Sequence, residues 1–395
     1  MTKHSLAAGP LLLLCSLLAQ CLLAAPAEAR AYTILHTFKN GDGIRPNGAL
    51  VADQSGNLYG TTRNTVFKLA PDGTETVLHS FSGYPYDGQT ALAGLIMGSD
   101  GNLYGTTEEG GDGNGCADSG CGTVFEITTD GKETILHSFD AGDGDGYYPV
   151  GKLTQDAAGS LYGTTYFGGD DQGVVFKLTS VGLTILHSFN RAHDGCNPNA
   201  GVLLDTSGNL YGTTYFGGAD VSDCNFNGRG TVFKVAADGS ETILHSFAKT
   251  PDGANPAGGL MMDAAGNLFG TTRAGGNGSG TVFEIAPDGT ETLVHTFAGP
   301  DGSEPESALI ADSQGNLFGT TFAGGQHALG TVFELTPQGD QSVLYSFRSR
   351  QGGNSPKGDL TINVDGALVG AAPLGGARGE NCHKQGCGTI FALSR

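Results

Sequence analysis

The chain has 395 residues, carries a net charge of −20 at pH 7, and contains 67 glycines but no tryptophan. A surface this acidic repels phosphate backbones, so nucleic acid is excluded as an expected partner. Glycine without a three-residue period excludes collagen, and a hydrophobic fraction of 38% arranged in regular runs excludes a disordered chain.

The first 29 residues are typical of a secretory signal peptide. Lys3 and His4 precede an apolar run that continues to Ala25, and residues 27–29 read Ala-Glu-Ala, a cleavage motif. A membrane anchor is the alternative, but the run is short and ends in that motif. No later segment is apolar enough to span a bilayer. We expect residues 1–29 to be removed and residues 30–395 to be secreted or periplasmic, with no membrane span.

Two motifs alternate along residues 30–395. The first, LYGTT or a variant of it, starts at Leu58, Leu103, Leu161, Leu210, Leu268, Leu317 and Leu368. The second, a TVF-type run, is centred on Val66, Val124, Val175, Val232, Val282, Val332 and Ile390. Each motif therefore occurs seven times, and a period of about 50 residues is typical of propellers or solenoids.

Each repeat contains four short runs with the composition of β-strands. In the fourth repeat they are residues 201–205, 210–214, 231–235 and 241–247. They are rich in Val, Ile, Thr, Tyr and Phe, are bounded by Gly, Asp and Asn, and lack helical spacing. A β-helix would need shorter, parallel coils. The sequence predicts an all-β, seven-bladed β-propeller over residues 30–395, with four antiparallel strands per blade.

The two ends of the chain are out of phase with the repeats. Residues 32–38 form an ILHSF-type run with no repeat before it, and residues 388–393 form a TVF-type run with no ILHSF-type run after it. We therefore expect the N-terminal strand to become the outermost strand of the last blade. This arrangement closes the ring and leaves no open edge between the first and last blades.

The ordered recurrence of LYGTT, a Gly-Gly loop, GTVFE and ETILHSF over residues 32–393 resembles the GloVer tandem repeat of secreted bacterial proteins. The resemblance implies export and a propeller-like fold, and it brings no established activity or catalytic residues. The pattern Leu-x-x-Asp-x-x-Gly-Asn-Leu-Tyr is more distantly similar to NHL and gluconolactonase-like blades.

Residues that recur in every blade are interpreted as structural, because a catalytic residue is needed only once. One strand position holds His36, His79, His137, His187, His245 and His295, with Tyr345 in the seventh repeat. Each histidine is expected to hydrogen-bond within its own blade, to a repeated Thr or Ser. The threonine pairs of LYGTT are expected to satisfy nearby backbone groups.

An Asp-Gly-x-x-Pro motif, without the proline in the second repeat, leads into the innermost strands. Its aspartates are Asp42, Asp87, Asp145, Asp194, Asp252 and Asp301. One interpretation is a turn fixed by the proline. The other is a ring of carboxylates near the central channel that holds a cation such as Ca²⁺. No cofactor is otherwise required, and the simplest calcium motif is absent because Thr154 stands in place of its final glutamate.

Six cysteines remain after the signal segment, and an even number in an exported protein indicates disulfides. Strand alternation places the LYGTT-to-TVF loops and the loops before the innermost strands on one face. The expected pairs are Cys116 with Cys121, Cys196 with Cys224, and Cys382 with Cys387. Zinc binding by Cys382, His383 and Cys387 is the alternative.

This loop-rich face is the expected position of a binding site. Its candidate ligand-binding residues are non-repeated side chains: Tyr147, Tyr148, Tyr166, Phe167, Tyr215, Phe216, Arg191 and His193. Aromatic rings beside charged groups suit a sugar platform. The alternative is that the rings only pack beneath the loops.

Three classes of function fit these features. The favoured one is a non-enzymatic binding or scaffold propeller for an extracellular glycan, a cell-surface ligand or a protein. The second is an extracellular enzyme on the same face, a glycan lyase, hydrolase or lactonase. Such chemistry needs two carboxylates, or a metal and a base, at a fixed spacing, and no spacing in the sequence singles out a pair. The third is a purely structural envelope or adhesion module.

Overall fold

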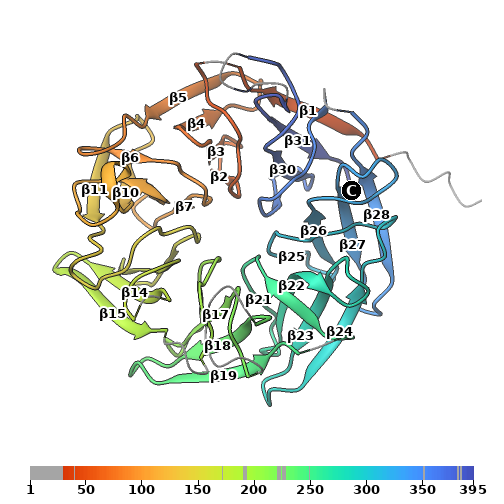
Figure 1. Ribbon diagram of the computed structural model, residues 1–395. Helices are drawn as coiled ribbons and strands as arrows, with labels where there is room; N and C mark the ends of the chain where they lie inside the picture. The colour runs from red at the N-terminus through yellow and green to blue at the C-terminus, as the bar shows by residue number, and fades with distance from the viewer. Residues whose placement is uncertain are drawn as a thin grey trace, which may run out of the picture.

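The computed structural model describes residues 30–395 except 40, 171, 190–193, 220–223, 225–227, 249, 350–351, 380–381 and 383–384. Within these residues, seven antiparallel sheets follow one another in a ring (Figure 1). The prediction of an all-β, seven-bladed propeller with four strands per blade is confirmed. The predicted signal peptide, residues 1–29, lies outside the described residues.

The strands of blades 1 to 4 are given from the innermost to the outermost. Blade 1 is β2 (Val51–Ala52), β3 (Leu58–Thr61), β4 (Thr65–Leu69) and β5 (Glu75–Ser80); blade 2 is β7 (Ile96–Met97), β8 (Leu103–Thr107), β10 (Thr123–Ile127) and β11 (Glu133–Ser138); blade 3 is β12 (Thr154–Gln155), β13 (Leu161–Thr165), β14 (Val174–Thr179) and β15 (Gly182–Ser188); blade 4 is β16 (Leu203–Leu204), β17 (Leu210–Thr214), β18 (Thr231–Val235) and β19 (Glu241–Ser246).

The remaining blades follow the same order. Blade 5 is β21 (Met261–Met262), β22 (Leu268–Gly275), β23 (Thr281–Ile285) and β24 (Glu291–Thr296); blade 6 is β25 (Ile310–Ala311), β26 (Leu317–Thr321), β27 (Thr331–Leu335) and β28 (Gln341–Ser346); blade 7 is β29 (Thr361–Ile362), β30 (Leu368–Ala372), β31 (Thr389–Leu393) and β1 (Tyr32–Thr37). Outside this scheme, β6 (Gly88–Gln89) pairs with β9 (Glu109–Gly110), β20 (Gly253–Pro256) pairs with β22, and η1 (Ala117–Ser119) is a 3-10 turn. No helix in the described chain is long and apolar enough to cross a membrane.

The ring closes as the sequence predicts. β1 pairs antiparallel with β31, with Tyr32 opposite Leu393 and Thr37 opposite Thr389. Figure 1 shows this first strand lying beside the last blade. The N-terminal strand therefore covers the edge that blade 7 would otherwise expose.

The innermost strands are shorter than predicted, with two residues each instead of runs of about five. The reason is crowding near the axis. A Cβ on Gly48 would lie 2.3 Å from the backbone nitrogen of Gly94, and one on Gly151 would lie 2.5 Å from that of Gly201. Backbones of neighbouring blades thus touch there, and only a short segment is free to pair within its own sheet.

The hydrophobic core lies between the blades, in seven clusters that each join one blade to the next. In every cluster the phenylalanine that ends an ILHSF run meets edge-on the phenylalanine of the next blade's TVF strand. The seven centroid distances lie between 5.0 and 5.4 Å. Aromatic pairs prefer this geometry, so one repeated contact holds the ring together.

The first threonine of the pair satisfies a backbone carbonyl, as predicted, in blades 1, 2, 3 and 5, whereas the hydroxyls of Thr213 and Thr320 have no hydrogen-bond partner among the described residues. Thr61 donates to the carbonyl of Ala93 at 2.7 Å, and Thr164 donates to that of Ala200 at 2.8 Å. In each case the first threonine of the pair joins its blade to the inner loop of the next one. The second threonine bonds within its own blade, as Thr107 does with Thr123 at 2.8 Å.

Candidate functional site

The ring encloses a cavity of about 880 Å³ at its axis. All seven blades contribute to its wall, through residues 47–49, 92–94, 96, 150–154, 199–203, 257–262, 306, 308–310 and 357–360. These segments follow the Asp-Gly-x-x-Pro motifs and include the innermost strands. A cavity of this size lies within the range of roughly 300–1,000 Å³ that small-molecule sites occupy.

The two loop types lie together on one face, as predicted. Isolated antiparallel bridges join them: Tyr147 with Phe167, Cys196 with Phe216, Ser303 with Ala323, and Asn354 with Leu374. Each bridge pairs the loop before an innermost strand with the LYGTT-to-TVF loop of the same blade. The two loops are therefore held as one surface around the axis.

Three positions of the repeat differ from blade to blade on this face. The position after the threonine pair holds Arg63, Glu108, Tyr166, Tyr215, Arg273, Phe322 and Pro373. The position three residues after the motif aspartate, or after Gly352 in the seventh repeat, holds Arg45, Thr90, Tyr148, Asn197, Asn255, Glu304 and Ser355. The position five residues after it holds Asn47, Leu92, Val150, Asn199, Ala257, Glu306 and Lys357. The third of them lines the cavity in all seven repeats, whereas the first contributes Glu108, Tyr166, Tyr215 and Arg273 to the two hollows and the second contributes Tyr148. Because the scaffold repeats and these residues do not, they are the part of the surface free to specify a ligand.

The second of these positions has a left-handed backbone in all seven repeats, with φ between 53° and 59°. Its amide bonds to the preceding blade, as Tyr148 N does to Cys121 O at 2.9 Å and Glu304 N does to Ser279 O at 2.9 Å. A non-glycine residue in this conformation costs on the order of 1–3 kcal/mol, and the surrounding contacts must hold it there. Since all seven repeats share it, the conformation belongs to the scaffold and presents these side chains rigidly.

An ion-pair network occupies one side of the cavity's mouth. Arg273 contacts Glu304 at 2.8 Å and Glu306 at 3.0 Å, and its Nη1 donates to the hydroxyl of Tyr215 at 3.2 Å. Lys357 pairs with the other oxygen of Glu306 at 2.9 Å. Burial opposes the charge of Arg273, but these partners outweigh it and raise the pKa of the guanidinium. Two cations and two carboxylates therefore neutralise one another across blades 5, 6 and 7.

Aromatic side chains occupy the adjoining arc. Tyr148, Tyr166 and Phe167 line the axial cavity, and Phe167 packs edge-on against Tyr166 at 4.8 Å. A smaller hollow of about 260 Å³ joins the aromatic arc to the ion pairs, because Tyr166, Tyr215, Arg273, Glu306 and Lys357 all line it. Burial, with the neighbouring Tyr215, raises the pKa of Tyr166, so its hydroxyl stays protonated at neutral pH.

Only some of the predicted ligand-binding residues line the cavity or the adjoining hollow. Tyr148, Tyr166 and Phe167 lie on the cavity and Tyr215 lies on the adjoining hollow. Tyr147 and Phe216 are not among the cavity residues. Tyr147 stacks on Phe167 at 5.4 Å, and Phe216 lies edge-on to Tyr215 at 4.7 Å, so both support rings that do line the site. Arg191 and His193 lie outside the described residues.

The sequence interpretation missed Glu304, Glu306, Lys357 and Asn199 as site residues. A signal for them exists in the sequence. They stand three or five residues after the motif aspartate, or after Gly352 in the seventh repeat, at positions where the repeats differ, whereas the aspartate itself recurs in the other six. A comparison of the repeats column by column would have selected them.

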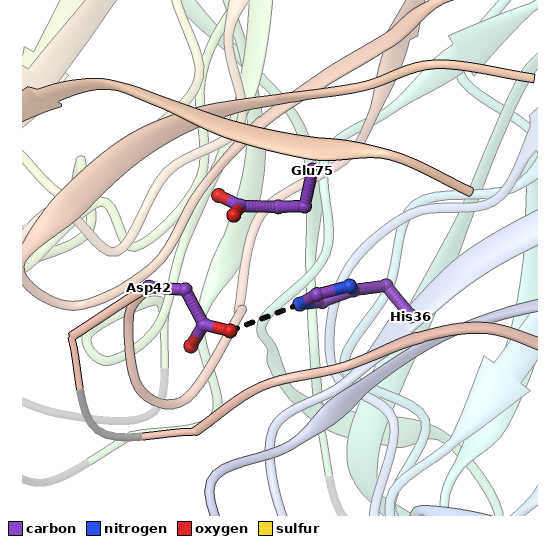
Figure 2. Close-up of side chains that lie close together, drawn as sticks. All are labelled: His36, Asp42 and Glu75. Carbon is purple, nitrogen blue, oxygen red and sulfur yellow. Dashed lines mark hydrogen bonds and ion pairs between the residues drawn. The ribbon is translucent and has the colours of Figure 1, made fainter. Parts of the chain in front are cut away.

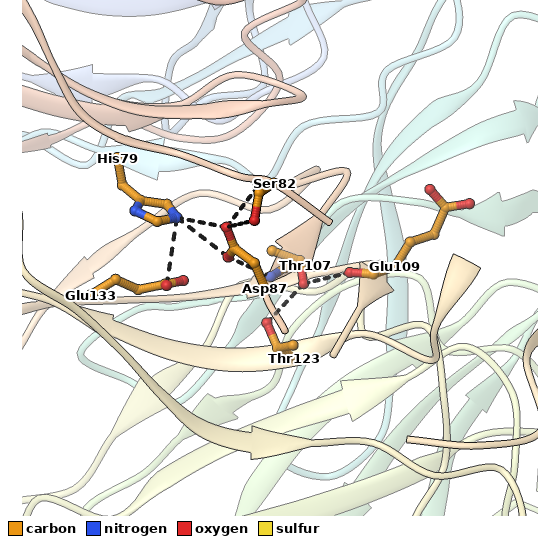
Figure 3. A network of polar contacts seen from close by, with 8 residues as sticks. His79, Ser82, Asp87, Thr107, Glu109, Thr123 and Glu133 are labelled. Carbon is orange, nitrogen blue, oxygen red and sulfur yellow. Dashed lines mark hydrogen bonds and ion pairs between the residues drawn. The ribbon is translucent and has the colours of Figure 1, made fainter. Parts of the chain in front are cut away.

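The six motif aspartates lie elsewhere, at the junctions between blades. Asp42 bonds His36, Asp87 bonds His79, Asp145 bonds His137, Asp194 bonds His187, Asp252 bonds His245 and Asp301 bonds His295, at 2.7–3.3 Å. Figure 2 and Figure 3 show the first two junctions. Each histidine lies on an outermost strand, and none of the six aspartates lines the axial cavity. The carboxylates do not form one ring around the channel, and the expected Thr or Ser partner of the histidines was wrong.

The three predicted disulfides are confirmed. Cys116 pairs with Cys121, Cys196 with Cys224, and Cys382 with Cys387, with Cα atoms 5.2, 6.0 and 4.9 Å apart. The second bridge links the two long loops of blade 4 across 28 residues of sequence. The last pair forms a disulfide, so the alternative of zinc binding by these two cysteines was wrong.

The repeat and the fold were then compared with known proteins. Among solved structures, an inactive variant of virginiamycin B lyase from Staphylococcus aureus with quinupristin is 17% identical, with a TM-score of 0.63 over 93% of this chain and 99% of that chain. The extracellular domain of a hybrid two component system from B. thetaiotaomicron is 12% identical, with a TM-score of 0.57 over 92% of this chain and 41% of that chain. A gluconolactonase from Xanthomonas campestris is 13% identical, with a TM-score of 0.47 over 92% and 89%. At these identities the likeness to the first two shows the propeller fold alone.

No match is found among curated proteins. A model described as the Gloeobacter/Verrucomicrobia repeat matches residues 24–224, 91–328 and 220–395. Together these matches span all seven blades, and they confirm the resemblance that the repeated motifs indicate. The chain belongs to the Gloeobacter/Verrucomicrobia repeat family.

Proposed function

We propose that the chain is an exported binding propeller that holds a neutral sugar or oligosaccharide at the mouth of its axial cavity. The observation that carries the proposal is the asymmetry of the mouth. Seven repeats supply the same scaffold, yet blades 3 and 4 present tyrosines while blades 5 to 7 present a fixed ion-pair network. Sugars are bound by this combination, with a ring face stacked on an aromatic residue and hydroxyls bonded to charged groups.

The charge balance supports a neutral ligand. Arg273 and Lys357 are matched by Glu304 and Glu306, so the network carries no excess charge. The protein as a whole is strongly acidic, which disfavours an anionic ligand. Groups whose orientation is already fixed by ion pairs are suited to directional hydrogen bonds with hydroxyls.

Export is supported by two observations. The three disulfides are typical of proteins that mature in an oxidising compartment. The extracellular domains of a two component and a one component system from B. thetaiotaomicron share the propeller fold. The ligand would then be met in the periplasm or outside the cell.

Calorimetric titration with a panel of neutral oligosaccharides tests the proposal. Tyr166→Ala should weaken binding by about tenfold, since an aromatic contact of this kind contributes on the order of 1 kcal/mol beyond its buried area. Tyr86→Ala is the matched control, because Tyr86 is 86% exposed and lies outside both hollows. Absence of binding across the panel, or equal affinity of the Tyr166 variant and the parent, would show that the mouth does not bind sugars.

An enzyme at the same mouth is the second candidate, and one observation favours it. Glu108 and Glu306 both line the cavity but have opposite environments. Burial and the nearby Glu109 raise the pKa of Glu108, whereas Glu306 is held by two cations. Two carboxyls in contrasting environments can divide the roles of general acid and base. Loss of turnover with retained binding in Glu108→Gln would favour the enzyme over the binding protein.

A further inference from the structure

The junctions between neighbouring blades carry sets of side chains that can ligate a metal ion. At the junction of blades 1 and 2, His79 Nε2 lies 3.2 Å from Asp87 Oδ2 and 3.5 Å from Glu133 Oε2 (Figure 3). At the junction of blades 7 and 1, His36 Nε2 lies 3.3 Å from Asp42 Oδ2, and Glu75 faces both (Figure 2). In each set the ligating atoms all lie within 4.8 Å of one another.

The fold brings each set together through a bulge in the outermost strand. In β11, Phe125 pairs with Ile135 but Val124 pairs with His137, so one residue is extra between them. Without the bulge, Glu133 and His137 would share a face, because they are four residues apart. With it, Glu133 faces back toward blade 1 and His137 faces blade 3. Every junction of this kind therefore joins the histidine of one blade to the glutamate position of the next.

The glutamates are the unusual members of these sets. The Oε1 atoms of Glu75 and Glu133 are buried and have no hydrogen-bond partner among the described residues, and the same holds for Glu241 and Glu291 at two other junctions, so it is the closeness of the ligating atoms that distinguishes the two sets. Buried polar atoms are rarely left without one. Burial, together with nearby negative charge, raises the pKa of both carboxyls to about 7. Each set thus places a second carboxyl beside a His–Asp pair, where a cation would relieve the repulsion between the two carboxylates.

We propose that His36–Asp42–Glu75 and His79–Asp87–Glu133 are two divalent-cation sites of the Zn²⁺ type. Zn²⁺ takes imidazole nitrogens and carboxylate oxygens as ligands, and where the protein supplies three ligands, water takes the fourth position. Bonds of about 2.0–2.1 Å in a tetrahedron separate the ligand atoms by about 3.3 Å. The distances of 3.2 and 3.5 Å at His79 fit that spacing. An imidazole nitrogen argues against Ca²⁺, which prefers oxygen alone.

The neighbouring backbone orients the aspartates for this role. Asp87 accepts hydrogen bonds from Ser82 N at 2.7 Å, Ser82 Oγ at 3.0 Å and Gly88 N at 2.6 Å. Asp42 accepts from Lys39 N at 2.6 Å. Such outer contacts fix the ligands of metal sites and sharpen their geometry.

Other blade junctions of the same chain lack one or more of the proposed ligands and serve as internal controls. At the junctions of blades 2 and 3 and of blades 5 and 6, the glutamate position holds Leu183 and Gln341. At the junction of blades 6 and 7 the histidine and glutamate positions hold Tyr345 and Tyr32. Two further junctions, with Glu241 and Glu291, repeat the residue types, but within the described chain only the two proposed sets have all their ligating atoms within 4.8 Å. The expected content is two ions per chain.

Ions at these positions would stabilise the closed ring by linking strands of neighbouring blades. The first site joins the N-terminal strand β1 to β5, and the second joins β5 to β11, so both lie next to the closure. The closure depends on pairing of β1 with β31 without a covalent link between those strands. A metal that bridges β1 and β5 would couple the last blade to the first.

Elemental analysis of the untagged full chain, stripped with EDTA and then dialysed against Zn²⁺, tests the proposal. We expect two bound ions, one in Glu133→Gln, one in Glu75→Gln and none in the double variant. Glutamine is tolerated at this position in blade 6, so these variants should fold, which circular dichroism verifies. His137→Gln, at a junction that lacks the glutamate, should keep two ions.

Cobalt supplies a second measurement at the same sites. Co²⁺ in a four-coordinate site of nitrogen and oxygen ligands absorbs visible light, and each single variant should lose half of that absorbance. A chain that retains no Zn²⁺ after dialysis, or glutamine variants that retain both ions, would overturn the proposal. In the first case the unpaired carboxyl oxygens would be explained by protonation.

Discussion

Tyr32 stacks face to face on Tyr345, with ring centroids 3.9 Å apart and planes only 2° from parallel. The two residues occupy the positions that hold glutamate and histidine at other junctions, on β1 and β28. Tyr32 also donates its hydroxyl to the carbonyl of Gly352. The blade that closes the ring is therefore joined to its predecessor by an aromatic stack where other junctions have a polar set.

Tyr32→Ala should destabilise the protein by about 2–3 kcal/mol, less than a fully buried aromatic truncation, because Tyr32 is half-buried. Tyr32→Phe keeps the stack and should cost only about 1 kcal/mol for the lost hydrogen bond. Urea unfolding measures both changes. Tyr86→Ala, at an exposed position, should stay within about 0.5 kcal/mol of the parent. Equal stability of the Tyr32→Ala variant and the parent would mean that the strand pairing alone closes the ring.

The architecture was predictable because the sequence repeats its strands and offsets them at the two ends. The out-of-phase runs at residues 32–38 and 388–393 are compatible with one way of closing the ring, in which the N-terminal strand completes the last blade. β1 pairs with β31 in this way. The disulfides followed from the same topology, since strand alternation determines which loops share a face. The closure and the disulfides depend on the order of strands and loops along the chain, and that order can be read directly from the sequence.

The junction sets were not predictable, because they depend on a bulge. Alternation alone puts Glu133 and His137 on one face of β11, and a one-residue bulge in β11 between Ile135 and His137 puts them on opposite faces. The residues of the ETILHSF run do not predict that bulge. The histidines were for this reason given the wrong partners, and the aspartates were assigned to the channel instead of the junctions.

The pH dependence of stability should reveal the buried glutamates in metal-free protein. The pKa values of Glu75, Glu133 and Glu241 rise from 4.5 to about 7, chiefly through burial. The folded state therefore keeps protons that the unfolded state releases between pH 4.5 and 7. Across that window the free energy of unfolding should fall as pH rises, by about 1 kcal/mol per carboxyl once solvent screening is allowed for.

Urea unfolding at pH 5 and pH 8 in EDTA measures this slope. Replacing these three glutamates by glutamine should flatten it, and Gln341→Glu should steepen it by adding a further buried carboxyl at an equivalent position. A slope that is the same in all of these variants would mean that the carboxyls titrate alike in the folded and unfolded states.

The disulfide of blade 4 should stabilise the fold more than the two short bridges. It closes a loop across 28 residues, whereas each of the others spans 5. The chain-entropy relation gives about 3.5 kcal/mol for the long loop and about 2 kcal/mol for a short one. Thermal melts of the Cys196→Ser/Cys224→Ser and Cys116→Ser/Cys121→Ser double variants should show the larger loss in the first. The opposite order would contradict the entropic account at these loops.

Arg273 should matter for binding far more than for folding. Arg273→Met leaves Glu304 and Glu306 without their shared cation and removes the donor to Tyr215. Because the guanidinium side chain is 42% exposed, its ion pairs should contribute only about 1 kcal/mol to stability. Sugar affinity should fall by at least tenfold, since two carboxylates then repel each other where the ligand's hydroxyls must bond.

The matched control is Arg30→Met, which removes a partly exposed ion pair with Glu334. It should change stability by a similar small amount and leave sugar affinity unaltered. Adding Glu306→Gln to Arg273→Met should recover stability by relieving the repulsion, but it should not recover affinity, because the fixed donors are still missing. A loss of several kcal/mol in the single variant with unchanged sugar affinity would assign the network to the scaffold instead of to the site.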